Sequence, residues 1–447
     1  MSFVRKQLYY AAKALSRSRS PRVFEARLRE YHAGIPAETT SRRLTALLRH
    51  CAANVPYYAA LIEPLGGFAA CERDPQALLR QMPILTKAIL REQVEALKSR
   101  DYTTRRWYVN TSGGSTGEPV RLIQDEDYRA CASANTLLFS ALAGKTPGKR
   151  EVRLWGSERD IFEGSVGWKG RLTAGLTNTV FLNAFRMTPE TMREYLARIQ
   201  SLRPKLILAY AQALYELAQF AERERIPIAP QYAIITSAGT LYPFMKDTLK
   251  RVFGCPVYNR YGSREVGDIA SELPGREGLW VPPWNNYVEI VDEAGCPVEP
   301  GEEGHILVTC LTNFSMPLLR YQIGDTGILA TEGMRNLTGQ VLERVTGRVT
   351  DNFRTRQGRV IPGEYFIHLI GVVLNQGFLQ KFQIVQTDYD RITLKLVTGG
   401  ETFDTTEMAA KIKLVMDPDC QVQVEFVEDI PPLASGKYRY TISEVPH

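Results

Sequence analysis

Apolar residues recur at helical spacing through the first quarter of the chain. Between residues 20 and 100, leucines repeat at three- and four-residue intervals, as in Thr40-Ser-Arg-Arg-Leu-Thr-Ala-Leu-Leu-Arg. Pro56 and Pro83 break the pattern, and Thr86 is the expected cap of a helix that follows the second break. The spacing predicts a helical N-terminal region over about 1–100.

Between about residue 105 and residue 260, short apolar runs alternate with helical stretches. The apolar runs, each of strand length, are 106–109, 120–123, 151–155, 204–209, 232–236 and 255–258. The helical stretches are 125–143, 188–202, 211–225 and 243–253. Such alternation predicts a largely parallel sheet covered by helices, the arrangement of an α/β protein.

After residue 280 the pattern becomes one of hairpins. Segments 286–291 and 304–309 flank the turn sequence Asp292-Glu-Ala-Gly295 and predict antiparallel strands. From about residue 350 a smaller unit follows, with strand patterns at 381–385, 391–397 and 421–426 around a helical stretch at 405–416. The fold class that follows is α/β, with a large N-terminal part and a small α+β part at the C-terminus.

The composition is that of an ordinary globular chain. The 447 residues are 44% hydrophobic and 23% charged, which allows two or three domains with apolar cores. No segment has the ~20 apolar residues of a membrane span, and no apolar signal core precedes the first charges. The seven cysteines are scattered and show no Cys-x-x-Cys spacing, which predicts buried thiols in a reducing cytoplasm.

Positive charge is concentrated at the N-terminus. Residues 1–30 hold eight Lys or Arg against two Glu, within a net charge of +6 for the chain. Because Val4, Leu8 and Leu15 lie at helical spacing, one interpretation is an amphipathic helix with a solvated basic face. The alternative is an arm that contacts a membrane surface or nucleic acid. We favour the solvated helix, since runs of charge usually face water.

The sequence Thr111-Ser-Gly-Gly-Ser-Thr-Gly-Glu-Pro119 stands between two predicted strands. Its three glycines and four hydroxyl residues in nine positions suit a phosphate, because glycine lets backbone N–H groups converge and the hydroxyls add donors. It is not a Walker loop, since it lacks the Gly-Lys-[Ser/Thr] ending. A nucleotide triphosphate site and a flexible hairpin loop are the two interpretations.

Four further segments carry chemistry. Tyr261 and Glu265 follow a predicted strand, where an aromatic ring can stack on adenine and a carboxylate can hold Mg²⁺. Asp325 follows a glycine and suits ribose hydroxyls, Arg348 adds a cation, and Lys437 stands on a polar turn. Each has a plain structural alternative, but together with the glycine-rich segment they favour one nucleotide site.

Together these segments resemble the adenylate-forming superfamily, specifically its phenylacetate:CoA ligase branch, which includes capsule-biosynthesis members. The resemblance covers about residues 35–445. The glycine-rich segment is similar to the family's phosphate loop, and Tyr261-Gly-Ser-Arg-Glu265 is similar to its aromatic-Gly-x-x-Glu motif. Arg320-Tyr-Gln-Ile-Gly-Asp325 is similar to its Arg-Tyr-x-x-Gly-Asp motif.

Three shorter segments extend the resemblance. Ser237-Ala-Gly-Thr240 stands where the family has a glycine-rich turn against the adenine. Gly347-Arg348 resembles the start of its interdomain hinge, and Ser435-Gly-Lys437 resembles its catalytic-lysine motif. The resemblance thus implies an N-terminal adenylation domain over 1–348 and a small mobile C-terminal domain over 349–447.

The same resemblance implies roles for individual residues. Catalytic roles fall to Lys437 and Glu265, with Glu265 also holding the Mg²⁺ that accompanies ATP. Nucleotide binding falls to Thr111, Ser112, Gly113, Gly114, Ser115, Thr116, Gly117, Ser237, Ala238, Gly239, Thr240, Tyr261, Gly262, Ser263, Asp325 and Arg348.

The activity implied is ATP-dependent activation of a carboxylic acid as an acyl-adenylate, followed by transfer to CoA. An amine acceptor, in polysaccharide or secondary-metabolite biosynthesis, and a non-catalytic nucleotide-binding homologue remain alternatives. Trp155, Phe185 and Tyr210 are candidates for the acid pocket, although aromatic residues are more often core. No nucleic-acid partner is expected.

Two departures from the family pattern matter. The hinge reads Gly-Arg-Val-Thr-Asp here, so Thr350 stands where an acidic pivot residue is usual. Some members carry a cysteine cluster for zinc after the Tyr-Gly motif, whereas residues 271–280 contain no cysteine. We therefore expect no structural zinc.

Overall fold

The structure of the chain is a computed structural model. It describes residues 6–7, 9–11, 18–111, 121–155, 175, 177–184, 187–239, 241–331, 337–346, 351–361, 363–370, 379, 381–398, 403–430 and 439–445.

Short helices form the N-terminal part of the chain, as the leucine spacing predicts. They are α2 (Ser20–Ala33), α3 (Thr39–Asn54), α4 (Pro56–Ile62), α5 (Gly67–Arg73), α6 (Pro75–Arg80), α7 (Lys87–Glu92) and α8 (Val94–Leu97). Thr86 caps α7 as predicted, since its Oγ1 accepts a hydrogen bond from the Ile89 amide at 3.2 Å. The basic segment before residue 18 lies mostly outside the described residues.

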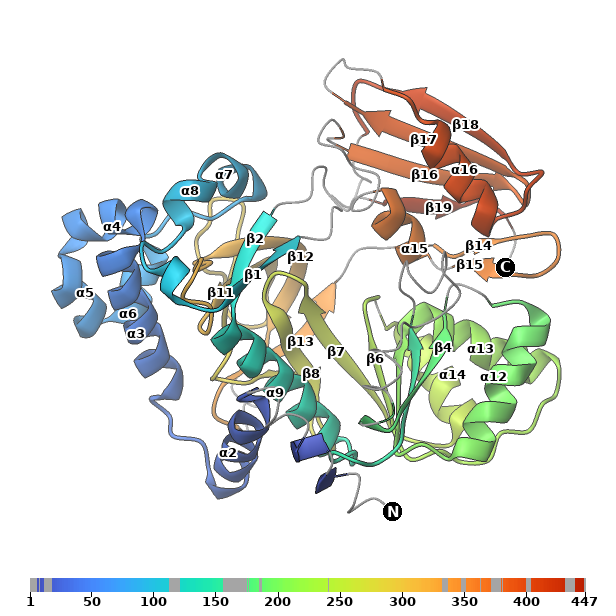
Figure 1. Ribbon diagram of the computed structural model, residues 1–447, viewed down its shortest axis with the longest axis horizontal. Coiled ribbons are helices and arrows are strands. Elements are labelled where there is room, and N and C mark those ends of the chain that lie inside the picture. Colours follow the sequence, from blue (N-terminus) through green and yellow to red (C-terminus); the bar gives the residue numbers. More distant parts are fainter. Residues whose placement is uncertain are drawn as a thin grey trace.

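One sheet runs through the large part of the molecule (Figure 1). Its strands are β3 (Glu151–Trp155), β4 (Thr179–Asn183), β5 (Leu206–Tyr210), β6 (Ile234–Ser237), β7 (Val257–Ser263), β8 (Gly267–Glu272), β9 (Leu279–Val281), β10 (Asn286–Val291), β11 (Glu303–Cys310), β12 (Tyr321–Leu329) and β13 (Gln340–Thr346). Among the described residues, their order is β10-β11-β12-β13-β9-β8-β7-β6-β5-β3-β4.

The sheet changes character at β7. Neighbouring strands from β4 to β7 are parallel, whereas the pairs from β7 to β10 are antiparallel. Helices α12 (Pro189–Leu202), α13 (Ala211–Arg223) and α14 (Pro243–Phe253) accompany the parallel strands and share a buried core with them. Long β7 therefore joins a parallel half and an antiparallel half.

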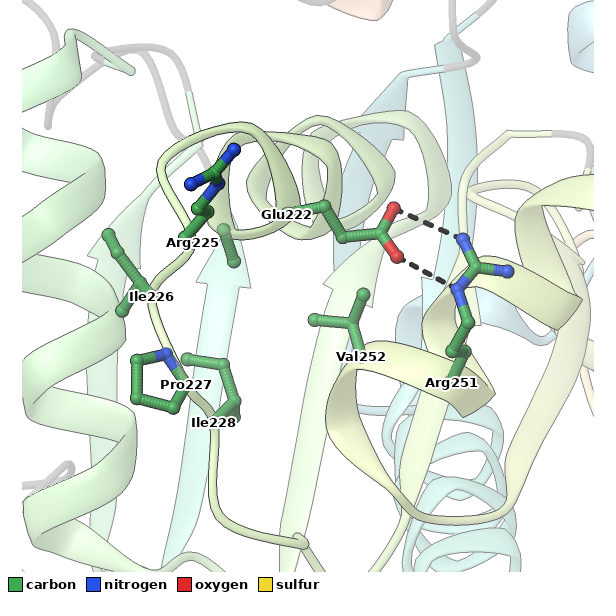
Figure 2. Close-up of a pocket in the computed structure, with 8 residues that line it drawn as sticks. Glu222, Arg225, Ile226, Pro227, Ile228, Arg251 and Val252 are labelled. Atoms are coloured by element: carbon green, nitrogen blue, oxygen red, sulfur yellow. Dashed lines mark hydrogen bonds and ion pairs between the residues drawn. The ribbon is translucent and has the colours of Figure 1, made fainter.

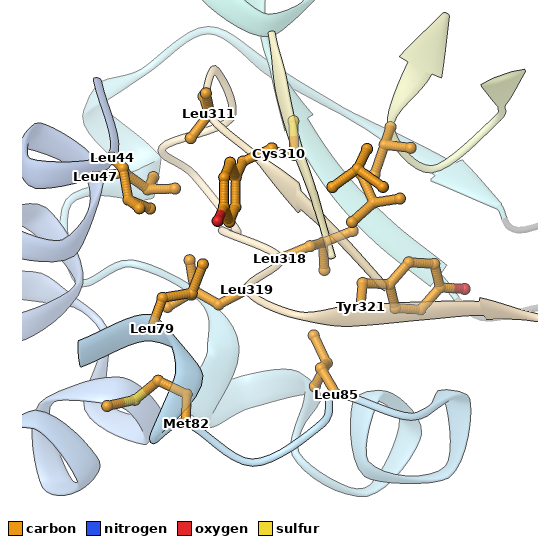
Figure 3. Close-up of a cluster of buried hydrophobic side chains, with 14 of the residues drawn as sticks. Leu44, Leu47, Leu79, Met82, Leu85, Cys310, Leu311, Leu318, Leu319 and Tyr321 are labelled. Carbon is orange, nitrogen blue, oxygen red and sulfur yellow. The ribbon is translucent and has the colours of Figure 1, made fainter. Parts of the chain in front are cut away.

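The helices α3 and α6 are held to the antiparallel half by a leucine-rich core. Figure 3 shows Leu44 and Leu47 of α3 near Leu79, with Leu319 and Tyr321 on the facing segment. All five side chains are fully buried, and each buried leucine stabilises the fold by ~1.5–3 kcal/mol. This core also fixes the position of Tyr321.

A separate hairpin stands beside this sheet. It consists of β1 (Trp107–Thr111) and β2 (Arg121–Asp125), which pair antiparallel with Thr111 opposite Arg121. The helix α9 (Glu126–Leu142) follows directly, and the Asp125 carboxylate caps it by accepting from the Tyr128 amide at 2.8 Å. The two strands flank residues 112–120, which include all but the first residue of the segment 111–119 predicted to wrap a phosphate.

A small α+β unit forms the C-terminal part and lies above α12–α14 in Figure 1. Its elements are β14 (Phe353–Arg354), β15 (Val360–Ile361), α15 (Gly363–His368), β16 (Lys381–Asp388), β17 (Arg391–Val397), α16 (Thr406–Val415), β18 (Gln421–Phe426) and β19 (Thr441–Ser443). Its main sheet has the order β18-β17-β16-β19, and Phe353, Phe366, Phe382 and Ile412 belong to a core of its own. The predicted α/β class with a separate α+β part is confirmed.

Two details differ from the sequence-based expectations. Strand β4 was not predicted. This edge strand lacks a regular alternation of buried and accessible positions, since the neighbouring Val180 and Phe181 are both accessible and Phe181 is 40% exposed. All seven cysteines are free thiols, but Cys296 is exposed and Cys131 is half-buried, so the prediction of buried thiols is wrong for these two. No helix among the described residues is long and apolar enough to cross a bilayer.

Candidate active site

The parallel half of the sheet contains a topological switch point. The connection after β3 leads to β4 on one side, whereas the connection after β5 leads to β6 on the other. Ligands of open α/β sheets bind outside the carboxyl ends of the strands at such a point. Trp155 ends β3 and Tyr210 ends β5, and their ring centroids lie 4.2 Å apart. Two of the predicted pocket residues therefore meet where this architecture places a ligand.

Tyr210 also links the two parts of the chain. Its partly buried ring packs against the core of the parallel half and against the core of the small C-terminal unit. A pocket beside Tyr210 would thus be bounded by both parts.

The tyrosine and aspartate of two separate motifs are joined by a hydrogen bond. Tyr261 Oη donates to Asp325 Oδ2 at 2.9 Å, although the residues are 64 positions apart. Tyr261 was predicted on a loop, but it lies within β7, because antiparallel pairing with β8 extends that strand to Ser263. The bond holds the Asp325 carboxylate in one direction, as an acceptor for sugar hydroxyls requires.

The same two motifs meet a second time at Glu265. This residue lies in the turn between β7 and β8 and is 6% exposed. Its Oε1 accepts a hydrogen bond from Tyr321 Oη at 3.3 Å. Since Tyr321 is fixed in the leucine-rich core, it fixes the carboxylate in turn.

Gly262 and Ser263, between Tyr261 and Glu265, have different surroundings. A Cβ atom on Gly262 would lie 2.6 Å from the carbonyl oxygen of Gly267, so the close approach of β8 requires glycine there. Gly262 therefore has a structural reason independent of nucleotide binding. Ser263 Oγ, by contrast, is buried and has no hydrogen-bond partner among the described residues, which leaves it available to a ligand oxygen.

The predicted adenine turn begins at the carboxyl end of β6. Ser237 is its last residue and is 7% exposed. Ala238 follows with φ of 62°, in the left-handed region that costs a non-glycine residue ~1–2 kcal/mol. Strain of this kind concentrates at ligand sites. Gly239 comes next and is partly accessible.

The chain is similar to known proteins in sequence and in fold. Residues 353–444 match the family model of the CapK C-terminal domain. The chain is 24% identical over 420 residues to Protein CapK of Staphylococcus aureus, covering 91% of this chain and 89% of that protein. It is 28% identical over 353 residues to a phenylacetate-coenzyme A ligase of Thermus thermophilus, covering 74% of each.

In fold, the chain is similar to a 2-hydroxyisobutyryl-CoA ligase. The structure of that protein with 2-HIB-AMP and CoA in the thioesterification state gives a TM-score of 0.57 at 20% identity, covering 92% of this chain and 91% of that one. The predicted resemblance to the adenylate-forming superfamily, in its phenylacetate-CoA ligase branch with CapK, is confirmed. The prediction of an AMP-forming ligase is confirmed at this level.

Several predicted site residues lie outside the described residues. They are Ser112, Gly113, Gly114, Ser115, Thr116, Gly117, Phe185, Thr240, Arg348 and Lys437. Thr350 and the proposed domain boundary at 348/349 also lie there. Their roles, and the boundary, stay predictions.

Sequence reasoning missed two residues of the site. Asn110 and Gln124 lie on the facing strands of the β1–β2 hairpin, and their side chains hydrogen-bond the backbone at Arg264. Gln124 is 1% exposed. An amide directly after the apolar pair Leu122-Ile123 was a usable signal, because a buried amide needs partners.

A separate hollow of about 200 Å³ lies where α13 ends and α14 approaches it (Figure 2). Glu222 and Arg251 form a two-bond ion pair at its edge, at 2.8 and 3.1 Å, and Ile226, Pro227 and Val252 supply its apolar wall. None of the motif residues lines it, so it is not the active site.

The described residues fit a magnesium nucleotide. Glu265 is a buried carboxylate, and no Lys, Arg or His among the described residues pairs with it, so a cation would satisfy it. Among these residues no three His, Cys, Asp or Glu side chains cluster as a metal site. A single buried carboxylate fits the way Mg²⁺ is commonly held, by one or two carboxylates and phosphate oxygens. The absence of structural zinc stays a prediction.

Proposed function

We propose that this protein is an ATP-dependent acid:CoA ligase. In the first step an oxygen of the carboxylate forms a bond to the α-phosphorus of ATP, and the bond from that phosphorus to pyrophosphate breaks. In the second step the sulfur of CoA forms a bond to the acyl carbon, the bond from that carbon to AMP breaks, and the thiol proton leaves. The products are a thioester, AMP and pyrophosphate.

The paired contacts Tyr261–Asp325 and Glu265–Tyr321 carry this proposal. These two hydrogen bonds join the motif 261–265 to the motif 320–325, which lie on strands that are not neighbours in the sheet. Tyr261 lies in the second half of β7, beyond the residues that pair with β6 as the last parallel strands of the sheet. A ribose-binding carboxylate and a metal-binding carboxylate would then face the same ligand.

Asp325, Glu265 and Ser263 would have separate tasks. Asp325, aimed by Tyr261, would accept hydrogen bonds from ribose hydroxyls. Glu265 would hold Mg²⁺, which when bound supplies positive charge to the phosphate oxygens. Ser263 Oγ would donate to a phosphate or ribose oxygen. The backbone amides of 112–117 and the ammonium of Lys437 would stabilise charge that develops at phosphorus.

We propose that the organic part of the acid binds at the switch point beside Trp155 and Tyr210. Their ring centroids lie 4.2 Å apart and the ring planes are tilted by 45°, so an acid would lie against the edge of this pair rather than between the rings. Phe185 would contribute from the segment after β4. A flat or apolar acid suits such a wall better than a highly polar one.

CoA is the acceptor we favour, because curated relatives over about three-quarters of the chain are phenylacetate-coenzyme A ligases. We place the reaction in the cytoplasm, where seven unpaired thiols would stay reduced. An amine acceptor would give an amide with the same first step. The resemblance to CapK leaves capsule biosynthesis as one setting.

ATP–pyrophosphate exchange with a panel of carboxylic acids tests the first step. Exchange that depends on one class of acid supports the proposal, and adding CoA or candidate amines then identifies the acceptor. ATP binding without exchange for any acid would instead indicate a non-catalytic nucleotide-binding protein. Gly117→Val should weaken ATP binding in a folded protein, because a Cβ would obstruct the backbone donors.

A further inference from the structure

Two side-chain amides, the half-buried Asn110 and the buried Gln124, connect Thr111 to the backbone of Glu265. The amide of Thr111 donates to Asn110 Oδ1 at 2.9 Å. Asn110 Nδ2 donates to Gln124 Oε1 at 2.9 Å and to the Arg264 carbonyl at 3.1 Å. Gln124 Nε2 donates to the carbonyls of Arg264 and Glu265 at 3.2 and 2.9 Å.

This network permits one orientation of each amide. Both N–H bonds of Asn110 and both of Gln124 are used, and each side-chain oxygen accepts one bond. Rotating the Gln124 amide by half a turn would place its oxygen against two carbonyl oxygens. Because Gln124 is only 1% exposed, water cannot easily relieve such a clash.

We propose that Asn110 and Gln124 are positioning residues that hold the backbone of Glu265, the proposed metal-binding carboxylate, in place relative to Thr111 at the end of β1. The inference rests on the proposed function, since it concerns how that site holds Mg²⁺ with ATP. Neither amide contacts the nucleotide in this assignment. Gln124 acts by fixing the backbone on which Glu265 stands, while Tyr321 fixes the carboxylate itself.

Gln124→Met is the informative change, since methionine keeps the length of the side chain and removes its hydrogen bonds. Gln340→Met is the matched control. Gln340 likewise hydrogen-bonds a backbone segment: it accepts from the Val288 amide at 2.8 Å and donates to the Val288 carbonyl at 2.6 Å. It lies on β13 and touches none of the motif residues through these bonds.

Titration calorimetry of purified protein with ATP, in Mg²⁺ and in EDTA, separates positioning from general support. The wild-type protein should bind ATP more tightly with Mg²⁺. In Gln124→Met the gain from Mg²⁺ should fall about tenfold, as when partners of a metal ligand are removed, with affinity in EDTA within about twofold of wild type. Gln340→Met should keep the full gain.

Other results would overturn the assignment. An unchanged Mg²⁺ gain in folded Gln124→Met would do so, as would an equal loss with and without Mg²⁺ or an equal loss in Gln340→Met. If Gln124→Met does not fold, Asn110→Ala takes its place, and failure of both to fold would make the pair a folding element only. A wild-type protein that does not bind ATP would refute the proposed function itself.

Discussion

Glu216 and Arg354 form an ion pair between the large part of the chain and the small C-terminal part. Arg354 Nη2 lies 2.9 and 3.0 Å from the two carboxylate oxygens of Glu216, and the side chains are 15% and 8% exposed. The backbone of Arg354 is held by Gln386 of the small part. Arg354 therefore moves with that part, and rotation relative to α13 must break the pair.

Removing this pair should loosen the junction between the two parts. In Arg354→Met, a loss of only ~1.4 kcal/mol of interdomain attraction would raise the separated population about tenfold. Proteolytic cleavage between residues 346 and 351 should accelerate accordingly in limited digests. Arg356→Met is the control, because Arg356 is 61% exposed and pairs with Asp390 inside the small part. Equal cleavage rates in the two variants would contradict the role of the pair.

Tyr261→Phe should weaken nucleotide binding without disturbing the fold. The ring stays, but Asp325 loses a hydrogen bond to a charged group, an interaction worth ~1.5–3 kcal/mol. We expect ATP affinity to fall by about tenfold or more, measured by calorimetry. Tyr195→Phe provides the comparison, since it removes a hydroxyl bonded to the Asn183 carbonyl at 3.1 Å. If Tyr261→Phe binds ATP normally, the hydrogen bond between Tyr261 and Asp325 does not contribute to nucleotide binding.

Gly262→Ala should lower the free energy of unfolding, while the variant that remains folded should still bind ATP. The new Cβ would press on the Gly267 carbonyl from 2.6 Å, and such overpacking costs ~1–3 kcal/mol. Urea denaturation measures the loss. Gly275→Ala introduces strain at φ +68° with no atom within 4 Å, so it isolates backbone strain from collision. A smaller loss in Gly262→Ala than in Gly275→Ala would count against the close approach of β8.

The stability of the N-terminal helices should fall in mild acid through His50. Burial lowers the pKa of His50 below its usual 6.5; Asp101 and the Phe314 carbonyl act in the opposite direction, and Arg105 adds to the lowering. With a lower pKa in the folded state, the unfolded chain binds the proton first as the pH falls below about 6.5.

Urea unfolding at about pH 7.5 and about pH 5.5 tests this sign. Wild-type protein should lose stability over that interval, and His50→Gln should lose less, because glutamine does not titrate. Ser99 and Asn54 also hydrogen-bond the imidazole, so glutamine keeps a polar group in place. An identical pH dependence in both proteins would show that other groups dominate.

Lys437→Ala should impair the first half-reaction selectively. Loss of one transition-state donor typically costs ~10²–10³ in rate, so pyrophosphate exchange should fall by that order. Product formation from preformed acyl-adenylate and CoA should continue, provided that the small part rotates Lys437 away for the second step. Loss of both steps together would make the lysine a folding residue, and loss of neither would make it a solvated tail residue.

The sequence by itself determined the class of fold and most of its elements. Leucine spacing placed the N-terminal helices, and alternating runs placed β3, β5, β6 and the helices between them, because these signals are local. The glycine-rich segment, Tyr261, Glu265 and Asp325 carried the resemblance to the family for the same reason. A short motif needs particular side chains at fixed spacing, so it can be recognised from the sequence alone.

Only the tertiary structure decided which distant residues meet. The switch point that joins Trp155 to Tyr210 follows from strand order, which a list of strands does not contain. The pair of Glu216 with Arg354 depends on how the large part and the small C-terminal part lie against each other. The bond between Gln124 and the Glu265 carbonyl spans 141 positions. Long-range contacts of this kind depend on packing of the whole chain, which no local pattern encodes.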